Sequence, residues 1–103
     1  MIGPADRQAL RHVLAAFADR IDSVALFGSR ATGRARPNSD IDIVIYGMLD
    51  QAAVDRLWSL LEDSALSVSV DIVAYGDGVY PPLRQHIDRT ARPLFSRAEL
   101  QAA

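Results

Sequence analysis

The chain places two acidic residues inside the apolar stretch DIDIVIY, residues 40–46. Asp40 and Asp42 alternate with isoleucines at positions 41, 43 and 45. Because successive side chains of a β-strand point to opposite faces, a strand here would bury the isoleucines on one face and carry both aspartates on the other. A buried carboxylate without a partner costs several kcal/mol or is forced to take up a proton. The stretch therefore predicts a strand whose acidic face requires a compensating ligand.

Apolar periodicity and turn residues predict helices and strands that alternate along the chain. Pro4 suits the first position of a helix, and Asp50 is suited to cap another. Such alternation indicates a small α/β (α+β) fold built in layers, with residues 1–103 as one domain. The expected elements are helices over residues 4–20, 50–64 and 83–91, strands over residues 24–27, 40–46 and 68–74, a helical turn over residues 29–33 and an extended segment over residues 93–95.

A third aspartate lies in another apolar stretch, VSVDIVAY. Asp71 falls on the face opposite Val70 and Ile72, so it would share a cleft with Asp40 and Asp42 if the two strands are neighbours. The Cα atoms of Asp40 and Asp42 would lie about 6.6 Å apart, which lets both carboxylates reach a pair of divalent ions about 3.5–4 Å apart. Mg²⁺ takes hard oxygen ligands and would keep these groups ionised. The three aspartates therefore predict a dinuclear metal site.

A glycine and a serine end the first predicted strand, at Gly28 and Ser29. A glycine at a strand end allows a ligand to approach the backbone closely, and a following helical turn aims N–H groups at an anion. The Ser29 hydroxyl can add a hydrogen bond to a phosphate, and Arg30 is placed to offset charge on a leaving pyrophosphate. Each feature alone is common, but their conjunction with the three strand aspartates is rare and predicts a phosphate-binding site.

The overall composition removes several classes of function. A formal net charge of -2 argues against nonspecific coating of nucleic acid, and the absence of cysteine excludes disulfides and thiolate metal sites. The sequence contains no run of roughly 18 apolar residues, so it predicts no transmembrane helix. The start MIGPADRQAL lacks the features of a signal peptide. We therefore expect a cytoplasmic protein with neither a membrane nor a direct nucleic-acid partner.

The stretch GSRATGRARPNSDID, with VDIV downstream, resembles the nucleotidyltransferase superfamily that includes DNA polymerase beta. The short length resembles its minimal nucleotidyltransferase (MNT) branch, and the resemblance covers essentially the whole chain. It implies a small mixed sheet flanked by helices, two Mg²⁺ ions, and a nucleoside triphosphate, usually ATP, as substrate. By the same resemblance Asp40 and Asp42 would ligate both metals, and Asp71 would ligate the catalytic metal and help activate the incoming hydroxyl. The triphosphate would contact the pair at positions 28 and 29.

Within that branch the sequence resembles the MNT antitoxins, which pair with HEPN-domain ribonuclease toxins. The leading hypothesis is therefore an adenylyltransferase that moves AMP from ATP to a hydroxyl, expected to be a tyrosine, of a partner HEPN toxin. One alternative is an antitoxin that neutralises the toxin by covering it, without catalysis. A third is a transferase for a small molecule such as an aminoglycoside.

The two histidines carry no pattern that assigns them chemistry. His12 and His86 both fall within predicted helices. We expect each at a surface or boundary position, without a role in the site.

Overall fold

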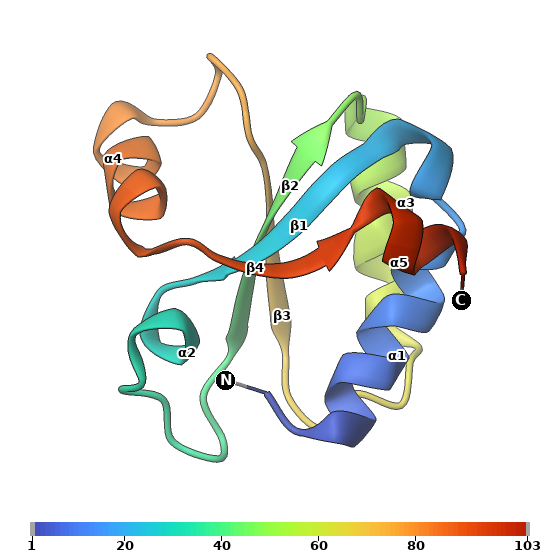
Figure 1. Ribbon diagram of the computed structural model, residues 1–103, viewed down its shortest axis with the longest axis horizontal. Helices are drawn as coiled ribbons and strands as arrows, with labels where there is room; N and C mark the ends of the chain where they lie inside the picture. Colours follow the sequence, from blue (N-terminus) through green and yellow to red (C-terminus); the bar gives the residue numbers. More distant parts are fainter. Residues whose placement is uncertain (1, 103) are drawn as a thin grey trace.

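The computed structural model describes residues 2–102, in which helices and strands alternate as the sequence predicts (Figure 1). The bounds of the elements, in chain order, are α1 (Pro4–Ala15), the 3₁₀ helix η1 (Ala18–Arg20), β1 (Ile21–Phe27), α2 (Ser29–Thr32), β2 (Ile41–Gly47), α3 (Gln51–Glu62), β3 (Val70–Ala74), α4 (Pro81–Thr90), β4 (Arg92–Ser96) and α5 (Arg97–Gln101).

The four strands form one mixed sheet in the order β3-β2-β1-β4. β2 and β3 run parallel, joined by a crossover through α3, while β1 pairs antiparallel with both β2 and β4. The expected mixed sheet flanked by helices is confirmed. Two register pairs matter for function, since Asp42 lies opposite Asp71 on β3 and opposite Phe27 on β1.

The two faces of the sheet bury different side chains. The isoleucines at positions 41, 43 and 45 enter the main core, which α1, α3 and α5 cover on one side of the sheet (Figure 1). The opposite face carries a smaller cluster in which Ile87 of α4 packs on Phe27 and Val44. Because Asp42 and Val44 share that face, α4 lies over the side of the sheet that holds the aspartate.

The starts of α1 and α3 follow the sequence closely, whereas α4 begins at Pro81 rather than residue 83 and other bounds also differ from those expected. Pro4 begins α1, and the Asp50 carboxylate accepts a 2.8 Å hydrogen bond from the Ala53 N–H, so both predicted starts are confirmed. The first helix ends at Ala15 rather than residue 20, and the remaining residues of the expected helix include the separate 3₁₀ turn η1. The second and third strands begin later than expected, at Ile41 and Val70, so Asp40 precedes its strand instead of opening it.

The carboxyl-terminal helix α5 was not expected from the sequence. Ser96 accepts a hydrogen bond from the Glu99 N–H at 3.2 Å, and the Glu99 carboxylate accepts one from the Ser96 N–H at 3.1 Å. This reciprocal pair is a capping box, which starts a helix too short to show apolar periodicity. Throughout residues 2–102, each helix is too short or too polar to cross a membrane.

Candidate active site

Asp42 and Asp71 lie side by side on the parallel strands β2 and β3. Asp42 is half-buried, whereas Asp71 is exposed at the sheet edge. Burial raises the pKa of Asp42, and the charge and hydrogen bonding of neighbouring Asp71 raise it further, with a smaller contribution from Asp40. Two carboxylates close enough to share a proton repel each other when both are ionised. The pair therefore forms a concentrated negative site at one end of the sheet.

Gly28 brings the backbone after β1 against this carboxylate pair. A Cβ atom built at Gly28 would lie 2.6 Å from Oδ2 of Asp42, and the residue has a φ of 71° and a ψ of -149°. Glycine alone adopts that backbone region readily. Its carbonyl accepts the hydrogen bond from the Ala31 N–H at 3.1 Å, and Ser29 opens the short helix α2. The predicted Gly-Ser turn and the aspartates thus meet in space.

Replacing Gly28 with alanine should destabilise the fold and displace Asp42. The matched control is Gly33→Ala, since Gly33 also has a positive φ of 76° but has open space around its Cβ position. The control should lose only the roughly 1–2 kcal/mol of left-handed backbone strain. Gly28→Ala adds the contact with Asp42 and the greater strain of a backbone region that only glycine adopts readily, so nucleotide binding separates displacement of Asp42 from strain. Thermal unfolding and nucleotide binding measure the two effects. Equal losses in both variants would show that Asp42 does not depend on the absence of a Cβ atom.

Asp40 is the third carboxylate that the sequence predicts for this site. It lies exposed before β2, at the end of the loop from α2, and it acts on Asp42 through its charge. Across residues 2–102, no three acidic or histidine side chains are grouped closely enough to hold one metal ion. That all three aspartates form one metal site stays a prediction, and β2 begins one residue later than expected, directly after Asp40.

The side chains at this end of the sheet nevertheless suit Mg²⁺. Carboxylate oxygens are its preferred protein ligands, and Asp42 and Asp71 provide two of them beside a glycine with no side chain of its own. A cation between the two groups would also relieve the repulsion that raises the pKa of Asp42. The residues present thus fit a divalent ion at this position, with Asp40 at its margin.

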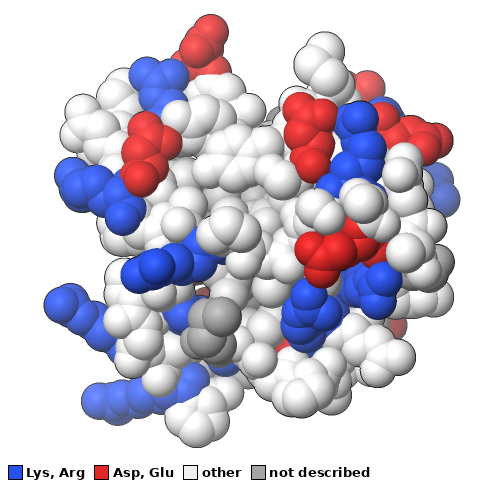
Figure 2. Space-filling model, viewed as in Figure 1, with Lys and Arg blue, Asp and Glu red and all other residues white. Residues whose placement is uncertain are grey.

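Arg30 is buried and binds the backbone of the loop that follows α2. The residue is only 7% exposed, and its Nη2 donates to the Ser39 carbonyl at 2.6 Å, with the Pro37 carbonyl 3.5 Å away. These contacts hold the loop that leads to Asp40. Figure 2 shows arginine side chains projecting from the lower left, over α2 and the loop that follows. The role of Arg30 at a leaving pyrophosphate stays a prediction, while the structure gives it a part in closing this loop.

His86 lies near the site, a position that the sequence analysis did not predict. Its ring packs on Phe27, with centroids 6.3 Å apart and an interplanar angle of 82°, and its charge lowers the pKa of Asp42 against the larger effects of burial and Asp71. A signal was present, because Leu83, His86 and Ile87 follow the spacing of one helix face. The boundary position expected for His86 is confirmed by its half-buried side chain, and the structure adds that it lies near Asp42.

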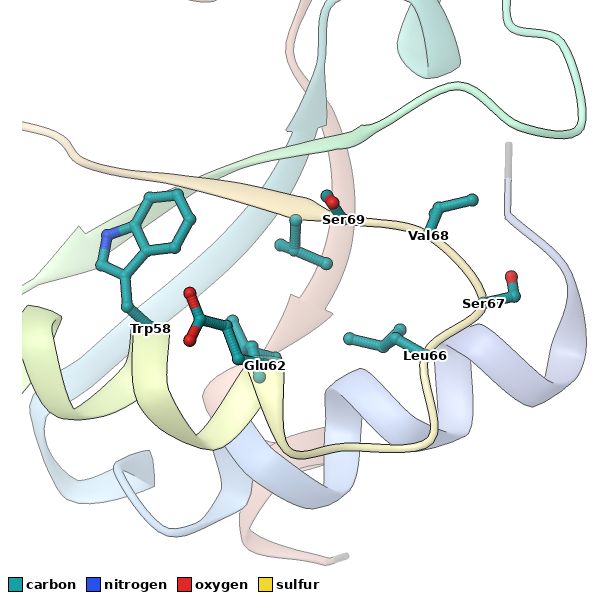
Figure 3. Close-up of a pocket in the computed structure, with 8 residues that line it drawn as sticks. Trp58, Glu62, Leu66, Ser67, Val68 and Ser69 are labelled. Atoms are coloured by element: carbon teal, nitrogen blue, oxygen red, sulfur yellow. The ribbon is translucent and has the colours of Figure 1, made fainter.

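A separate hollow of about 400 Å³ lies between α3 and the segment that leads into β3 (Figure 3). Trp58 and Glu62 line one side, and Leu66 and Val68 the other. It opens on the α3 side of the sheet, whereas Asp42 lies on the α4 side. This hollow is therefore not part of the carboxylate site.

Comparison with known proteins agrees with this geometry. The family described as polymerase beta, nucleotidyltransferase, matches residues 8–100. A structure described as a minimal nucleotidyltransferase is 34% identical, covers 86% of this chain and 89% of its own, and has a TM-score of 0.62. No protein of curated function matches the chain in sequence.

Two toxin–antitoxin structures are also similar. One, with AMP-PNP, is 27% identical over 88% of this chain and 73% of its own, with a TM-score of 0.71. The other is a tri-AMPylated Shewanella oneidensis HEPN toxin in complex with an MNT antitoxin. It is 23% identical, covers 89% of this chain and 71% of its own, and has a TM-score of 0.64. At this identity, the similarity to the second structure shows a shared fold and nothing further.

Proposed function

The chain belongs to the polymerase beta nucleotidyltransferase family, and on that premise we propose that it transfers AMP from ATP to a tyrosine hydroxyl of a partner HEPN toxin. The observation that carries the proposal is the meeting of Asp42, Asp71 and Gly28 at one end of the sheet. Paired strand carboxylates beside a phosphate-binding turn are what in-line transfer at a phosphorus atom requires.

The residues divide the work of this reaction between them. Asp40, Asp42 and Asp71 would hold two Mg²⁺ ions, which would supply positive charge to the attacking and leaving oxygens. Gly28 leaves space for the triphosphate, and the Ser29 hydroxyl donates a hydrogen bond to it. Asp71, exposed at the edge where an acceptor can approach, accepts the proton of the incoming hydroxyl. The hydroxyl oxygen forms a bond to the α-phosphorus. At the same time the bond between the α-phosphorus and the oxygen that bridges it to the β-phosphorus breaks, and pyrophosphate leaves.

The partner assignment is supported by the similar structures. The toxin–antitoxin structure with AMP-PNP is 27% identical to this chain and covers 88% of it. The minimal nucleotidyltransferase, at 34% identity, has a fold of nearly the same extent. We infer that this chain acts as an antitoxin, and that the acceptor protein, rather than a further part of the fold, presents the hydroxyl to the site.

Incubation of the chain with a co-purified HEPN toxin, Mg²⁺ and ATP tests the proposal. Label at the α-phosphate should appear on the toxin, while label at the γ-phosphate should not, because pyrophosphate is the leaving group. Chelation of the metal with EDTA should stop the reaction, and peptide mass spectrometry should place the AMP on a tyrosine. Transfer of the γ-label, or transfer that survives EDTA, would contradict the proposed chemistry.

A further inference from the structure

His86 is held beside the point where the Gly-Ser turn meets the carboxylates. Its half-buried imidazole packs in a T-shaped arrangement on Phe27, with the centroids 6.3 Å apart. Phe27 is the last residue of β1, directly precedes Gly28, and is paired across the sheet with Asp42. The Ile87 side chain next to His86 is fully buried against the same face, so the position of the helix is fixed. The imidazole is therefore held next to the Gly28 turn and near Asp42.

The contacts of His86 leave its ring nitrogens available to a ligand. Within the described part of the chain, the hydrogen bond at this residue is a backbone one, in which its carbonyl accepts from the Thr90 hydroxyl at 2.8 Å. An imidazole carries one N–H donor when neutral and two when protonated. Contact with the Phe27 ring satisfies the apolar surface of the imidazole but not these donors. A group beside the turn could therefore receive a hydrogen bond from His86.

A hydrogen-bond donor beside the Gly-Ser turn suits an anionic ligand, because the sequence predicts that this turn binds phosphate. Arg30, the cation expected from the sequence, instead donates to the Ser39 carbonyl at 2.6 Å. His86 is a basic side chain on the α4 side of the sheet, and it packs on the residue that precedes Gly28.

We propose that His86 is a nucleotide-binding residue whose ring N–H donates a hydrogen bond to a phosphate oxygen of the bound triphosphate. This rests on the proposed function, since it takes Gly28 and Ser29 as the position of the triphosphate. The order of the strands indicates whether His86 binds the phosphates or the acceptor. His86 packs on β1, the strand that leads into the Gly-Ser turn, whereas Asp71 lies on β3, two strands away. The imidazole therefore reaches the ligand from its phosphate side.

Binding measurements with two variants test the proposal. His86→Phe keeps an aromatic ring against Phe27 but removes the donor, while His86→Gln replaces the imidazole N–H with an amide N–H. Titration calorimetry of the full chain with Mg²⁺–tripolyphosphate and with Mg²⁺–α,β-methylene-ATP, which cannot transfer AMP, reports binding without turnover. We expect Kd for both ligands to rise at least about tenfold in His86→Phe, since a hydrogen bond to a charged group has at least that effect. His86→Gln should recover part of the loss.

His12→Phe on the exposed side of α1 is the matched control and should bind both ligands as the wild type does. The melting temperature without ligand should be nearly unchanged in His86→Phe, which separates loss of the donor from loss of packing. Unchanged Kd values in His86→Phe would overturn the proposal, as would a loss of AMP transfer with Kd intact, which would place His86 on the acceptor side. A wild-type chain that binds both ligands but transfers nothing would contradict the proposed function and leave the inference about His86 standing.

Discussion

Replacing Asp42 with asparagine should abolish AMP transfer while making the metal-free protein more resistant to heat. Asp42 is the half-buried member of the carboxylate pair and lies against both Gly28 and Asp71. Asparagine keeps the shape of the side chain but removes the charge that a divalent cation requires. Because loss of a few kcal/mol of transition-state stabilisation slows a reaction many-fold, we expect transfer to fall at least about a hundredfold. The free chain, by contrast, loses a source of repulsion.

The stability effect has a definite dependence on pH. Burial, and then the charge of Asp71, raise the pKa of Asp42 above its ordinary value of 3.8. A carboxyl group with a raised pKa destabilises the folded state once it is ionised, so the penalty is present at neutral pH and disappears as pH falls through the raised value toward 3.8. In EDTA, Asp42→Asn should therefore melt above the wild type at pH 7, and the difference should shrink in acid.

Asp19→Asn is a suitable control, because Asp19 is exposed on η1 and carries the same charge far from the pair along the sequence. It should alter neither transfer nor the pH dependence of melting. A lower melting temperature for Asp42→Asn at pH 7 in EDTA would show that the Asp42 carboxylate supports the fold rather than a ligand.

The arrangement of the carboxylates could be predicted because strand geometry is local. The alternation of side chains along a strand is enough to assign Ile43 and Asp42 to opposite faces of the sheet. In the structure Ile43 is buried in the core, and Asp42 lies on the other face, at the site. The same rule places Asp71 opposite Val70. That β2 and β3 are neighbours was an assumption, and the parallel register of Asp42 with Asp71 confirms it.

Other features of the site depend on packing that local rules do not contain. Arg30 is buried because the loop after α2 folds back over it and offers the Ser39 carbonyl, an event set by tertiary structure. The position of His86 depends on which face of the sheet receives α4, which periodicity alone does not decide. Asp40 was placed within its strand because element ends are the least certain part of a periodic pattern.

Asp71→Asn should separate catalysis from partner binding. The Asp71 carboxylate is exposed on the edge strand β3, while Asp42 and the Gly28 turn lie further into the sheet. In the proposed reaction Asp71 accepts the proton of the acceptor hydroxyl, and the triphosphate rests mainly on the inner residues. The variant should therefore keep much of its affinity for nucleotide, lose nearly all transfer, and still bind the HEPN toxin. Calorimetry with Mg²⁺–α,β-methylene-ATP, transfer of α-label and co-purification measure these three properties separately.

Toxicity in cells then distinguishes an enzyme from a protein that only covers its partner. If neutralisation is chemical, a toxin expressed with Asp71→Asn stays toxic, and its mass shows no added AMP although the complex forms. Asp77→Asn is the control, because it removes another exposed charge, from the turn after β3, at the cost only of a surface ion pair with Arg84, and should protect cells fully. Full protection by Asp71→Asn without modification of the toxin would contradict the enzymatic proposal, because contact alone would then suffice for neutralisation. Loss of binding by Asp71→Asn would instead place this edge of the sheet in the interface with the toxin.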